Sequence, residues 1–249
     1  MKHEIIRHRH ETRRRRLTVA EKFPITPAMI RVVLEGEELA DFISLGADDH
    51  VKLFLPADEA GRQEKRDYTP RSYDTKTRRL ALDFAVHEAG PATHWALGAK
   101  PGDEIEIGGP RGSAVVSPTF DWWLLVGDET ALPAIGRRIE EFSEGVEAIS
   151  VVAVTSAAEE QSFDTAARHT PHWAHRPAER ADDPEALLAV LRDIELPQGD
   201  GFVWIAAETA VARAVRAYVL DERQHPRAWI KAGGYWRKGE ADSHAKLND

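Results

Sequence analysis

Eight consecutive residues, Arg66–Tyr73, combine two arginines, two tyrosines, a threonine and a serine. A guanidinium offers a permanent, forked cation to phosphate oxygens, and an aromatic ring offers a flat surface with a polar edge. The stretch therefore suits a planar aromatic ligand that carries phosphates. The alternative for so short a motif is an exposed edge strand with scattered charges. The residues expected to contact the ligand are Arg66, Asp67, Tyr68, Thr69, Arg71 and Ser72.

A second candidate starts at Gly90-Pro91-Ala92-Thr93, an order that favours the beginning of a helix because proline suits the first turn. That turn presents unpaired N–H groups and the positive end of the helix dipole, which favour a phosphate. The alternative is a short capped helix with Trp95 in the core.

A third stretch, Gly108–Ser113, is rich in glycine, and its Arg111 is expected to meet a substrate or a phosphate. A turn between domains would have the same composition.

The second half offers the turn Gly127–Pro133, which follows a continuous apolar run and precedes a predicted helix. A strand, a turn and a helix start form the place where the pyrophosphate of a dinucleotide docks. Carboxylates beside phosphates would weaken that binding, and Thr130 would alternatively cap the helix. The residues expected at this nucleotide site are Asp128, Thr130 and Ala131.

Residues after the next predicted strand bear on the choice of nucleotide. Glu159 and Glu160 suit the free ribose of NADH better than the 2′-phosphate of NADPH, although Arg176 could still swing toward a 2′-phosphate.

His169, His172 and His175 recur at every third position, which raises the question of a metal site. Pro171 argues against a helix here, and an extended chain would turn the imidazoles to alternate faces, so no metal site is expected.

The C-terminal stretch Lys231–Glu240 places Tyr235 and Trp236 between basic residues. Two adjacent large aromatic side chains are unusual in a disordered end, so a functional segment is preferred over a frayed terminus.

The basic N-terminal residues 1–16 have three interpretations: a nucleic-acid arm, cations that line an anion site, or a solvated tail. The acidic remainder of the chain favours the tail.

The positions of these motifs follow from the secondary structure that the periodicity predicts. Apolar residues alternate, with turn signals between them, in six stretches that suit a small antiparallel barrel. The predicted strands are Leu17–Val19, Met29–Glu35, His50–Leu55, Arg66–Tyr73, Arg79–Val86 and Glu104–Gly108.

From Trp122 onward, continuous apolar strands alternate with amphipathic helices, which implies a parallel α/β sheet of the nucleotide-binding type. Two domains are therefore expected, residues 1–117 and residues 118–249. The predicted elements are strands at Trp122–Val126, Ile149–Val154, Phe202–Ala206 and Arg227–Lys231, and helices at Asp183–Asp193, at Glu208–Arg223 and from the Gly127–Pro133 turn to about Phe142.

The composition excludes several classes of chemistry. The 249 residues include no cysteine, which excludes disulfides, iron–sulfur clusters, thiolate metal sites and a cysteine nucleophile. A formal net charge of −9 disfavours non-specific binding to nucleic acid or anionic lipid. No apolar run is long enough to span a membrane, and the N-terminus lacks the apolar core of a signal peptide. A cytoplasmic protein is expected.

Five segments in order resemble the siderophore-interacting protein family, a family of FAD-dependent ferric-siderophore reductases within the ferredoxin–NADP reductase superfamily. They are RDYTPR, HEAGPATHWA, GPRGS, GDETALPA and GGYWRKG, and the resemblance extends from about Leu17 to Gly239. It implies a six-stranded antiparallel FAD-binding β-barrel followed by a Rossmann-like parallel α/β domain that binds NAD(P)H. It also implies further residues near FAD, which are His87, Gly90, Pro91, Ala92, Thr93, Trp95, Tyr235 and Trp236.

The implied reaction passes electrons from NAD(P)H through FAD to an Fe(III)–siderophore and releases Fe(II). We expect a cationic pocket for the anionic chelate, made by Lys52, Arg111, Lys231 and Arg237, while the alternative for each is a solvated surface charge. Two other functions remain open: a flavin reductase of the same fold that uses or serves a ferredoxin-type protein, and a siderophore-binding module without catalysis. A nucleic-acid partner is not expected, and nothing in the sequence demands more than a monomer.

Overall fold

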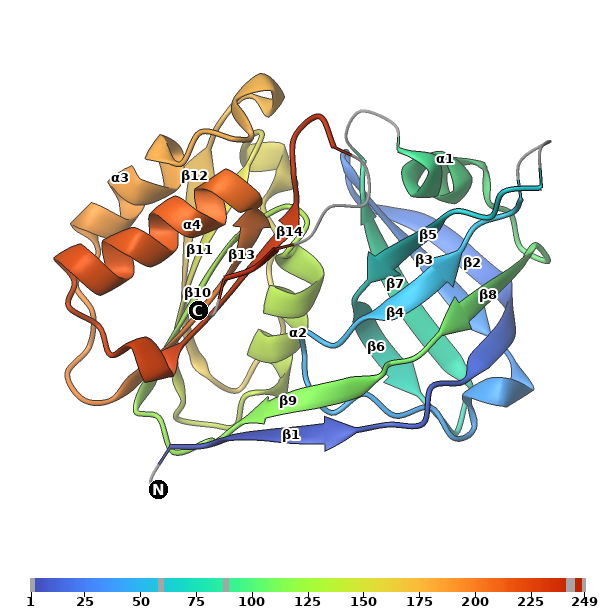
Figure 1. Cartoon of the computed structure of the whole chain (residues 1–249), viewed down its shortest axis with the longest axis horizontal. Coiled ribbons are helices and arrows are strands. Elements are labelled where there is room, and N and C mark those ends of the chain that lie inside the picture. Colours follow the sequence, from blue (N-terminus) through green and yellow to red (C-terminus); the bar gives the residue numbers. More distant parts are fainter. Residues whose placement is uncertain (1–2, 58–60, 87–89, 241–244, 248–249) are drawn as a thin grey trace. The chain divides into compact units, whose positions relative to one another are not determined.

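The computed structural model describes residues 3–57, 61–86, 90–240 and 245–247. The chain divides into two compact units, Met1–Ser117 and Pro118–Asp249, coloured from blue to green and from green to red in Figure 1. Each unit has its own hydrophobic core. Within the described residues, none of the helices combines the length and the apolar character needed to cross a bilayer.

The first unit is built on a seven-stranded antiparallel sheet in the order β5-β4-β8-β2-β3-β7-β6. Although β5 and β6 lie at opposite edges of this sheet, only Thr69 separates them in the chain. The sheet must therefore curl until its edges approach, which makes a barrel-like half-cylinder. The strands are β2 (Arg14–Thr26), β3 (Met29–Glu35), β4 (Val51–Phe54), β5 (Lys65–Tyr68), β6 (Pro70–Asp74), β7 (Arg79–Ala85) and β8 (Glu104–Gly108).

The predicted barrel class is confirmed, but the count of six strands is wrong by one. The predicted strand Arg66–Tyr73 is two strands, because the chain leaves one sheet edge at Thr69 and joins the other at Pro70. Pro70 has no N–H for a ladder, and the register of β6 against β7 shifts between Pro70 and Ser72. Elsewhere the alternation was a reliable guide: Ile105 and Ile107 of β8 are buried, while the glutamates beside them are not.

The basic N-terminus is a strand rather than a solvated tail. β1 (Ile5–Arg9) pairs antiparallel with β9 (Gly112–Val116), in a two-stranded sheet of its own. The close pairing explains one glycine of the GPRGS motif, since a Cβ at Gly112 would lie 2.3 Å from the carbonyl oxygen of His8. Helix α1 (Pro91–Gly98) begins where the Gly90-Pro91 order predicts and packs against β3 and β7.

The second unit contains a six-stranded sheet in the order β12-β11-β10-β13-β14-β15, parallel except for the short last strand. The order reverses at β10, so the switch point of this doubly wound sheet lies between β10 and β13. Its strands are β10 (Trp122–Asp128), β11 (Glu147–Val154), β12 (Arg168–His175), β13 (Gly201–Glu208), β14 (Ile230–Trp236) and β15 (Ala245–Lys246).

Helices cover both faces of this sheet (Figure 1). Every residue of β10 and β13 is buried, as the continuous apolar runs predict. One face packs against α3 (Glu185–Asp193) and α4 (Thr209–Ala217). On the other face lies α2 (Leu132–Glu141), with Ile135 and Ile139 fully buried. The predicted α/β class is therefore confirmed.

The last parallel strand differs from the prediction. Arg227–Trp229 forms a turn of 3-10 helix after Pro226, and β14 starts only at Ile230 and continues to Trp236. Tyr235 and Trp236, predicted to lie in a tail that runs back toward the flavin, therefore belong to the sheet. Gly234 allows this, because a Cβ there would lie 2.4 Å from Thr209 Oγ1 at the start of α4.

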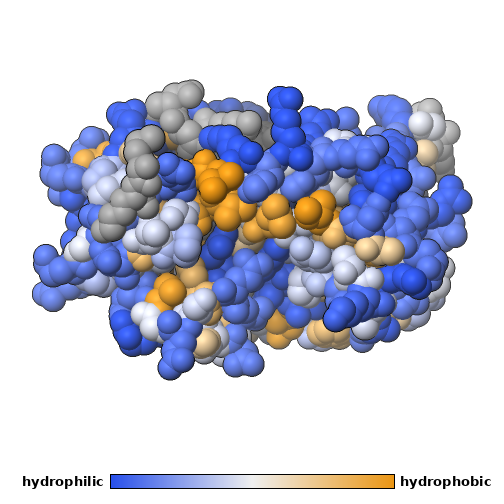
Figure 2. Space-filling model, turned by 90° about the horizontal axis from the view of Figure 1, so that it is seen from below, coloured by the Kyte–Doolittle hydropathy of each residue, from blue (hydrophilic) through white to orange (hydrophobic). Residues whose placement is uncertain are grey.

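The face shown in Figure 2 is mainly hydrophilic, with apolar patches along its middle. Among the residues described, the exposed large apolar side chains all belong to the first unit, and two of the five, Ile43 and Leu45, lie in the same loop. The five are Ile6, Phe23, Ile43, Leu45 and Leu97.

Candidate functional site

The strand β5 presents charge at its edge position in the first unit. Arg66 donates to Glu64 Oε2 at 2.6 Å and to the carbonyl of Lys65 at 2.9 Å, and its side chain keeps only one fifth of its exposure. Asp67 lies opposite Lys52 of β4 in the ladder, and Lys52 Nζ is 2.7 Å from Asp67 Oδ1. Lys52, which was predicted to meet the siderophore, is therefore paired within the sheet.

Tyr68 begins a row of three aromatic rings. Its centroid is 4.2 Å from that of Phe84, and Phe84 lies 5.8 Å from Trp95 of α1. Burial raises the pKa of the Tyr68 phenol above its usual range, against the opposing effect of Arg66, so the group stays a neutral donor at physiological pH. Phe84 is fully buried, and Tyr68 and Trp95 are half-buried. The row offers flat apolar surface next to one hydroxyl.

The residues after Thr69 lie deeper. Arg71 is buried, and its Nε is 3.8 Å from Asp83 Oδ2. Arg31 donates two hydrogen bonds to the same carboxylate, at 2.7 and 2.8 Å. Two guanidiniums thus approach the buried carboxylate of Asp83 from neighbouring strands. Ser72 points to solvent. The assignment of these residues to a cofactor stays a prediction.

Helix α1 starts with Gly90 as its N-cap and Pro91 in its first turn. The side chains of Ala92 and Thr93 are buried, with Thr93 Oγ1 donating to the carbonyl of Ala85 at 3.4 Å. The Pro91 side chain is exposed, and among the described residues nothing lies within 4 Å of the position a Cβ would take at Gly90, which leaves the backbone of this turn open to a ligand. His87 lies outside the described residues.

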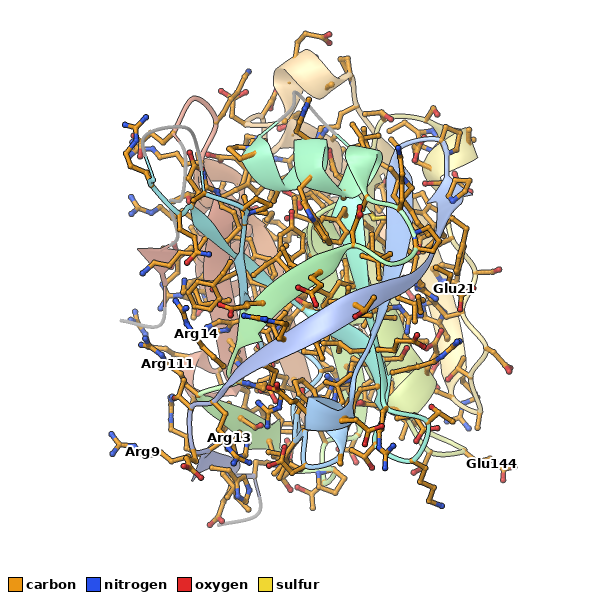
Figure 3. All side chains as sticks on the ribbon, turned by 90° about the vertical axis from the view of Figure 1, so that its right-hand side faces the viewer. Arg9, Arg13, Arg14, Glu21, Arg111 and Glu144 are labelled. Carbon is orange, nitrogen blue, oxygen red and sulfur yellow. The ribbon has the colours of Figure 1, made fainter. Side chains whose placement is uncertain are left out.

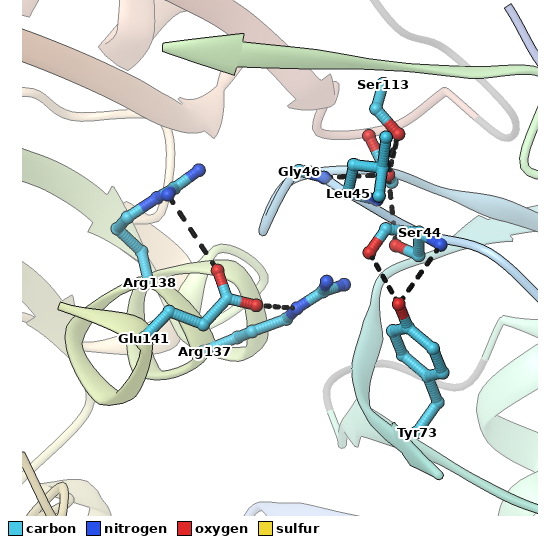
Figure 4. Close-up of polar contacts among 9 residues, drawn as sticks. Ser44, Leu45, Gly46, Tyr73, Ser113, Arg137, Arg138 and Glu141 are labelled. Atoms are coloured by element: carbon cyan, nitrogen blue, oxygen red, sulfur yellow. Dashed lines mark hydrogen bonds and ion pairs between the residues drawn. The ribbon is translucent and has the colours of Figure 1, made fainter. Parts of the chain in front are cut away.

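The turn Gly109–Ser113 is anchored by a polar network that the sequence did not indicate. Ser113 Oγ donates to Asp49 Oδ2 at 2.5 Å, accepts from the backbone N–H of Leu45 at 3.0 Å and lies 2.8 Å from His10 Nε2. Figure 4 shows the part of this network around Ser44 and Tyr73, whose hydroxyl donates to the Ser44 carbonyl at 3.1 Å. The network fixes the backbone on which Arg111 stands.

Arginines gather on the surface of the first unit. Figure 3 shows Arg9, Arg13, Arg14 and Arg111 there. Arg13 forms an ion pair with Asp41, and Arg14 bonds to Glu106 at 3.1 Å and lies over the Phe54 ring. Arg111 is exposed. Of the basic residues that were predicted to capture the siderophore, it is the one in this unit that extends into solvent.

In the second unit, Asp128 joins three parts of the sheet edge. Its Oδ1 accepts from the N–H and the hydroxyl of Thr130 at 2.9 and 2.6 Å. Its Oδ2 accepts from the N–H of Glu208 at 2.8 Å and from the indole N–H of Trp236 at 2.9 Å. Asp128 is only 1% exposed. Four donors saturate the carboxylate, so it holds the ends of β10, β13 and β14 together.

A second carboxylate occupies the start of α4. Glu208 accepts from the N–H groups of Ala210 and Val211 at 2.5 and 3.2 Å. This helix start is therefore already neutralised by the protein's own side chain. Helix α2 starts after Ala131 with no acidic residue in its first turn. Of these two helices beside the switch point, α2 is the one whose first turn suits a pyrophosphate.

An ion pair that the sequence did not predict lies at the same edge. Glu129 Oε2 is 2.7 Å from Arg176 Nη2, and the Arg176 side chain is 4% exposed. Burial, reinforced by the neighbouring Asp128, raises the pKa of Glu129 to about 7, although Arg176 acts in the opposite direction. A titratable group near neutrality at the edge of a doubly wound sheet is a candidate for function.

The predicted C-terminal cations have acidic neighbours. Arg237 is exposed and lies 2.9 Å from Glu240, and Lys238 is 2.7 Å from Asp182. Lys231 is half-buried in β14, and Tyr235 packs edge-on against Trp204 at 6.1 Å. Lys52 and Arg111 belong to the first unit and Lys231 and Arg237 to the second, so the four-residue pocket stays a prediction.

The histidine cluster carries no metal site among the described residues. His169 Nε2 is 2.9 Å from Ser150 Oγ, and His175 Nε2 is 2.8 Å from Glu160 Oε1. Burial lowers the pKa of His169, which favours its neutral form. Pro171 is tolerated because β12 is the edge strand of the sheet.

Comparisons with known families match both units. Residues 120–239 match the family described as Siderophore-interacting protein, and residues 18–65 and 57–114 match the one described as Siderophore-interacting FAD-binding domain. The residues of the Arg66–Tyr73 stretch and of α1 fall in the second of these matches, and the Asp128 and Arg176 contacts fall in the first.

Individual proteins agree with this assignment. The NADPH-dependent ferric-chelate reductase of Escherichia coli is 34% identical over 248 residues, with 92% of this chain and 94% of the relative covered. The ferric vibriobactin reductase ViuB of Vibrio cholerae is 26% identical, with 91% and 90% covered. A crystal structure of a siderophore utilization protein from T. fusca superposes with a TM-score of 0.89 at 36% identity, with 96% and 98% covered. The chain belongs to the siderophore-interacting protein family.

Proposed function

We propose that this protein is an FAD-dependent ferric-siderophore reductase that takes its electrons from NAD(P)H. The observation that carries the proposal is the presence, in one chain, of two sites with complementary chemistry. The first unit has the Arg66–Tyr68 strand beside the aromatic row, and the second has a doubly wound sheet with a helix start at its switch point. The related reductases act on ferric chelates, and one is named for NADPH.

The first unit fits FAD on the observations of its own residues. Tyr68 supplies a neutral phenol and a ring, and Trp95 extends the same apolar surface. Arg66 supplies a cation for phosphate, and the first turn of α1 supplies main-chain N–H groups. Bound FAD would accept an electron pair and release the electrons singly. The protein contributes binding, orientation and electrostatics.

The iron chemistry explains why no protein acid or base is required. A nicotinamide provides two electrons as hydride, whereas Fe(III) accepts one at a time. Hydroxamate and catecholate oxygens hold Fe(III) more tightly than Fe(II), so reduction loosens the metal without breaking the chelator. The protein's task at this end is to attract an anionic complex despite a net charge of −9. Exposed cations such as Arg111 and Arg237 suit that task.

The test is an absorbance spectrum of the purified protein, followed by anaerobic addition of NADPH or NADH and then of a ferric hydroxamate or ferric catecholate. We expect flavin bands that bleach with a nicotinamide and return as Fe(II) is trapped by a ferrous-specific chelator. Flavin bands that neither nucleotide bleaches would point to a ferredoxin-type donor. A protein that stays colourless after FAD is supplied would refute the reductase and leave a siderophore-binding module.

The siderophore pocket has its own test. We expect Arg237→Glu to raise the KM for an anionic ferric siderophore about tenfold and to leave FAD binding unchanged. Arg213→Glu is the matched control, because Arg213 is an exposed arginine on α4 of the same unit. Equal effects of the two substitutions would show that net charge matters and that the pocket does not. A cytoplasmic location and a monomeric state complete the proposal.

A further inference from the structure

Arg176 is a buried arginine with an unused donor. It follows β12 directly, its residue exposure is 5%, and one amino group, Nη2, bonds to Glu129 at 2.7 Å. The other, Nη1, is buried and has no hydrogen-bond partner among the residues that the structure describes. A guanidinium stays charged in proteins, and a buried donor without an acceptor destabilises the fold. The arrangement is therefore incomplete without a further acceptor.

The position of this arginine is the edge at which doubly wound sheets bind nucleotides. The backbone N–H of Arg176 bonds to the carbonyl of Val154, the last residue of β11, at 3.0 Å. Its side chain reaches Glu129, which comes directly after β10. The ion pair therefore links the carboxyl ends of β12 and β10 beside the end of β11. In such folds the ribose of the adenosine lies near the end of the second strand, which is β11 here.

A second unused donor comes from the same strand ends. Gln161 Nε2 is also buried without a hydrogen-bond partner in the described part of the chain. Gln161 follows Glu160, whose carboxylate is 2.8 Å from His175 at the end of β12. Both unused groups are donors, so the ligand that completes them must be rich in acceptor oxygens. A phosphate has this property, and a plain ribose hydroxyl has it much less.

We infer that Arg176 binds the 2′-phosphate of NADPH, and that Glu129 holds the guanidinium in the free protein and releases it to the incoming phosphate. The inference rests on the proposed function, since it names the electron donor of that reaction. It departs from the expectation of NADH, which depended on Glu159 and Glu160. Glu160 is engaged with His175 in the structure and is not free to bind a ribose.

The electrostatics of Glu129 support the exchange. Its pKa is raised to about 7 by burial and by Asp128, so its ionised form is held weakly even with Arg176 beside it. A phosphate dianion would satisfy both amino groups of the guanidinium, whereas the carboxylate satisfies one. A purely structural ion pair would instead support the fold and treat NADPH and NADH alike.

The test compares the binding of 2′,5′-ADP and 5′-ADP by calorimetry to the flavin-loaded protein. We expect the wild type to bind 2′,5′-ADP at least tenfold more tightly. Arg176→Gln should bring the two affinities within about twofold by weakening only 2′,5′-ADP, and Arg176→Lys should retain part of the preference. Glu129→Gln should strengthen 2′,5′-ADP binding several-fold by removing the internal competitor. The matched control Arg213→Gln, on the exposed face of α4, should change neither affinity.

Several outcomes would overturn the inference. They are equal affinities in the wild type, a preference that survives in Arg176→Gln, and a parallel loss of both ligands in a variant that keeps its melting temperature. If Arg176→Gln fails to fold, the affinities of Arg176→Lys and Glu129→Gln for 2′,5′-ADP and 5′-ADP test the inference instead. In steady state, the NADPH:NADH ratio of kcat/KM should fall at least tenfold in Arg176→Gln. Electron transfer to a ferric siderophore from dithionite-reduced protein tests the proposed function independently of either nucleotide.

Discussion

Replacing Asp128 by Asn should weaken the second unit, because four donors converge on the two oxygens of this buried carboxylate. Thr130 provides two hydrogen bonds to Oδ1, and Glu208 and Trp236 provide one each to Oδ2. An asparagine side chain has one oxygen and one NH2 group. If the NH2 group takes the place of Oδ2, the N–H of Glu208 and the indole N–H of Trp236 both lose their acceptor. If it takes the place of Oδ1, the N–H of Thr130 loses its acceptor, while the Thr130 hydroxyl can turn and accept from the amide.

The size of the effect follows from these contacts. Each stranded donor costs about 1–3 kcal/mol, and at least one is stranded in either orientation, so we expect Asp128→Asn to lower the free energy of unfolding by about 1–3 kcal/mol. Trp236→Phe removes one bond to a charged acceptor and should cost about 1.5–3 kcal/mol. In the double variant the indole donor is already gone. The combined loss should therefore be smaller than the sum of the single losses by at least about 1 kcal/mol.

Native-state hydrogen exchange provides the assay. The amides of Leu124, Val126 and Ile205 lie in fully buried central strands, and their slowest exchange reports the opening of the second unit. Asp164→Asn is the matched control, because Asp164 is exposed, and it should leave the exchange unchanged. Losses that add within about 0.5 kcal/mol, or a loss below about 1 kcal/mol in Asp128→Asn, would refute the reasoning.

Three further predictions concern other parts of the chain. The pKa of Glu129 is raised from 4.5 to about 7, so between these pH values the folded protein keeps a proton that the unfolded chain has released. The free energy of unfolding should therefore fall as pH rises through this window. Followed by circular dichroism, the fall should be larger in the wild type than in Glu129→Gln by up to about 3 kcal/mol. Gly112→Ala would place a Cβ 2.3 Å from the His8 carbonyl, so amide exchange in β1 should accelerate while β3 stays protected. Arg66→Ala should raise the Kd for FAD at least tenfold in fluorescence titrations, whereas an equal effect of Lys65→Ala, an exposed neighbour, would contradict a specific role.

The regular elements were the most predictable part of this molecule. Met29–Glu35 and Glu104–Gly108 are strands with the predicted bounds, because their alternation matches a sheet with one buried face. Helix α1 starts where Gly90 and Pro91 indicate. The periodicity gave no sign of the break at Thr69, because both sides of it are extended and only the path through space differs.

The contacts within the candidate sites were less predictable, because they join residues that are distant in the sequence. Trp236 bonds to Asp128 across 108 positions, and Arg176 meets Glu129 across 47. A motif shows which side chains are present, but not which of them are already satisfied by each other. The basic N-terminus shows the same limit, since the pairing of β1 with β9 depends on a partner about a hundred residues away.

The path of the chain through Thr69 has a further consequence for the first unit. In a closed barrel, hydrogen bonds join the first and last strands, whereas here a single residue carries the chain between the two edge strands β5 and β6. The seam is thus held by covalent bonds. A circular permutant with new termini at Thr69 would keep every ladder and lose this tether. Its two edges would be free to part and to recruit strands from other molecules.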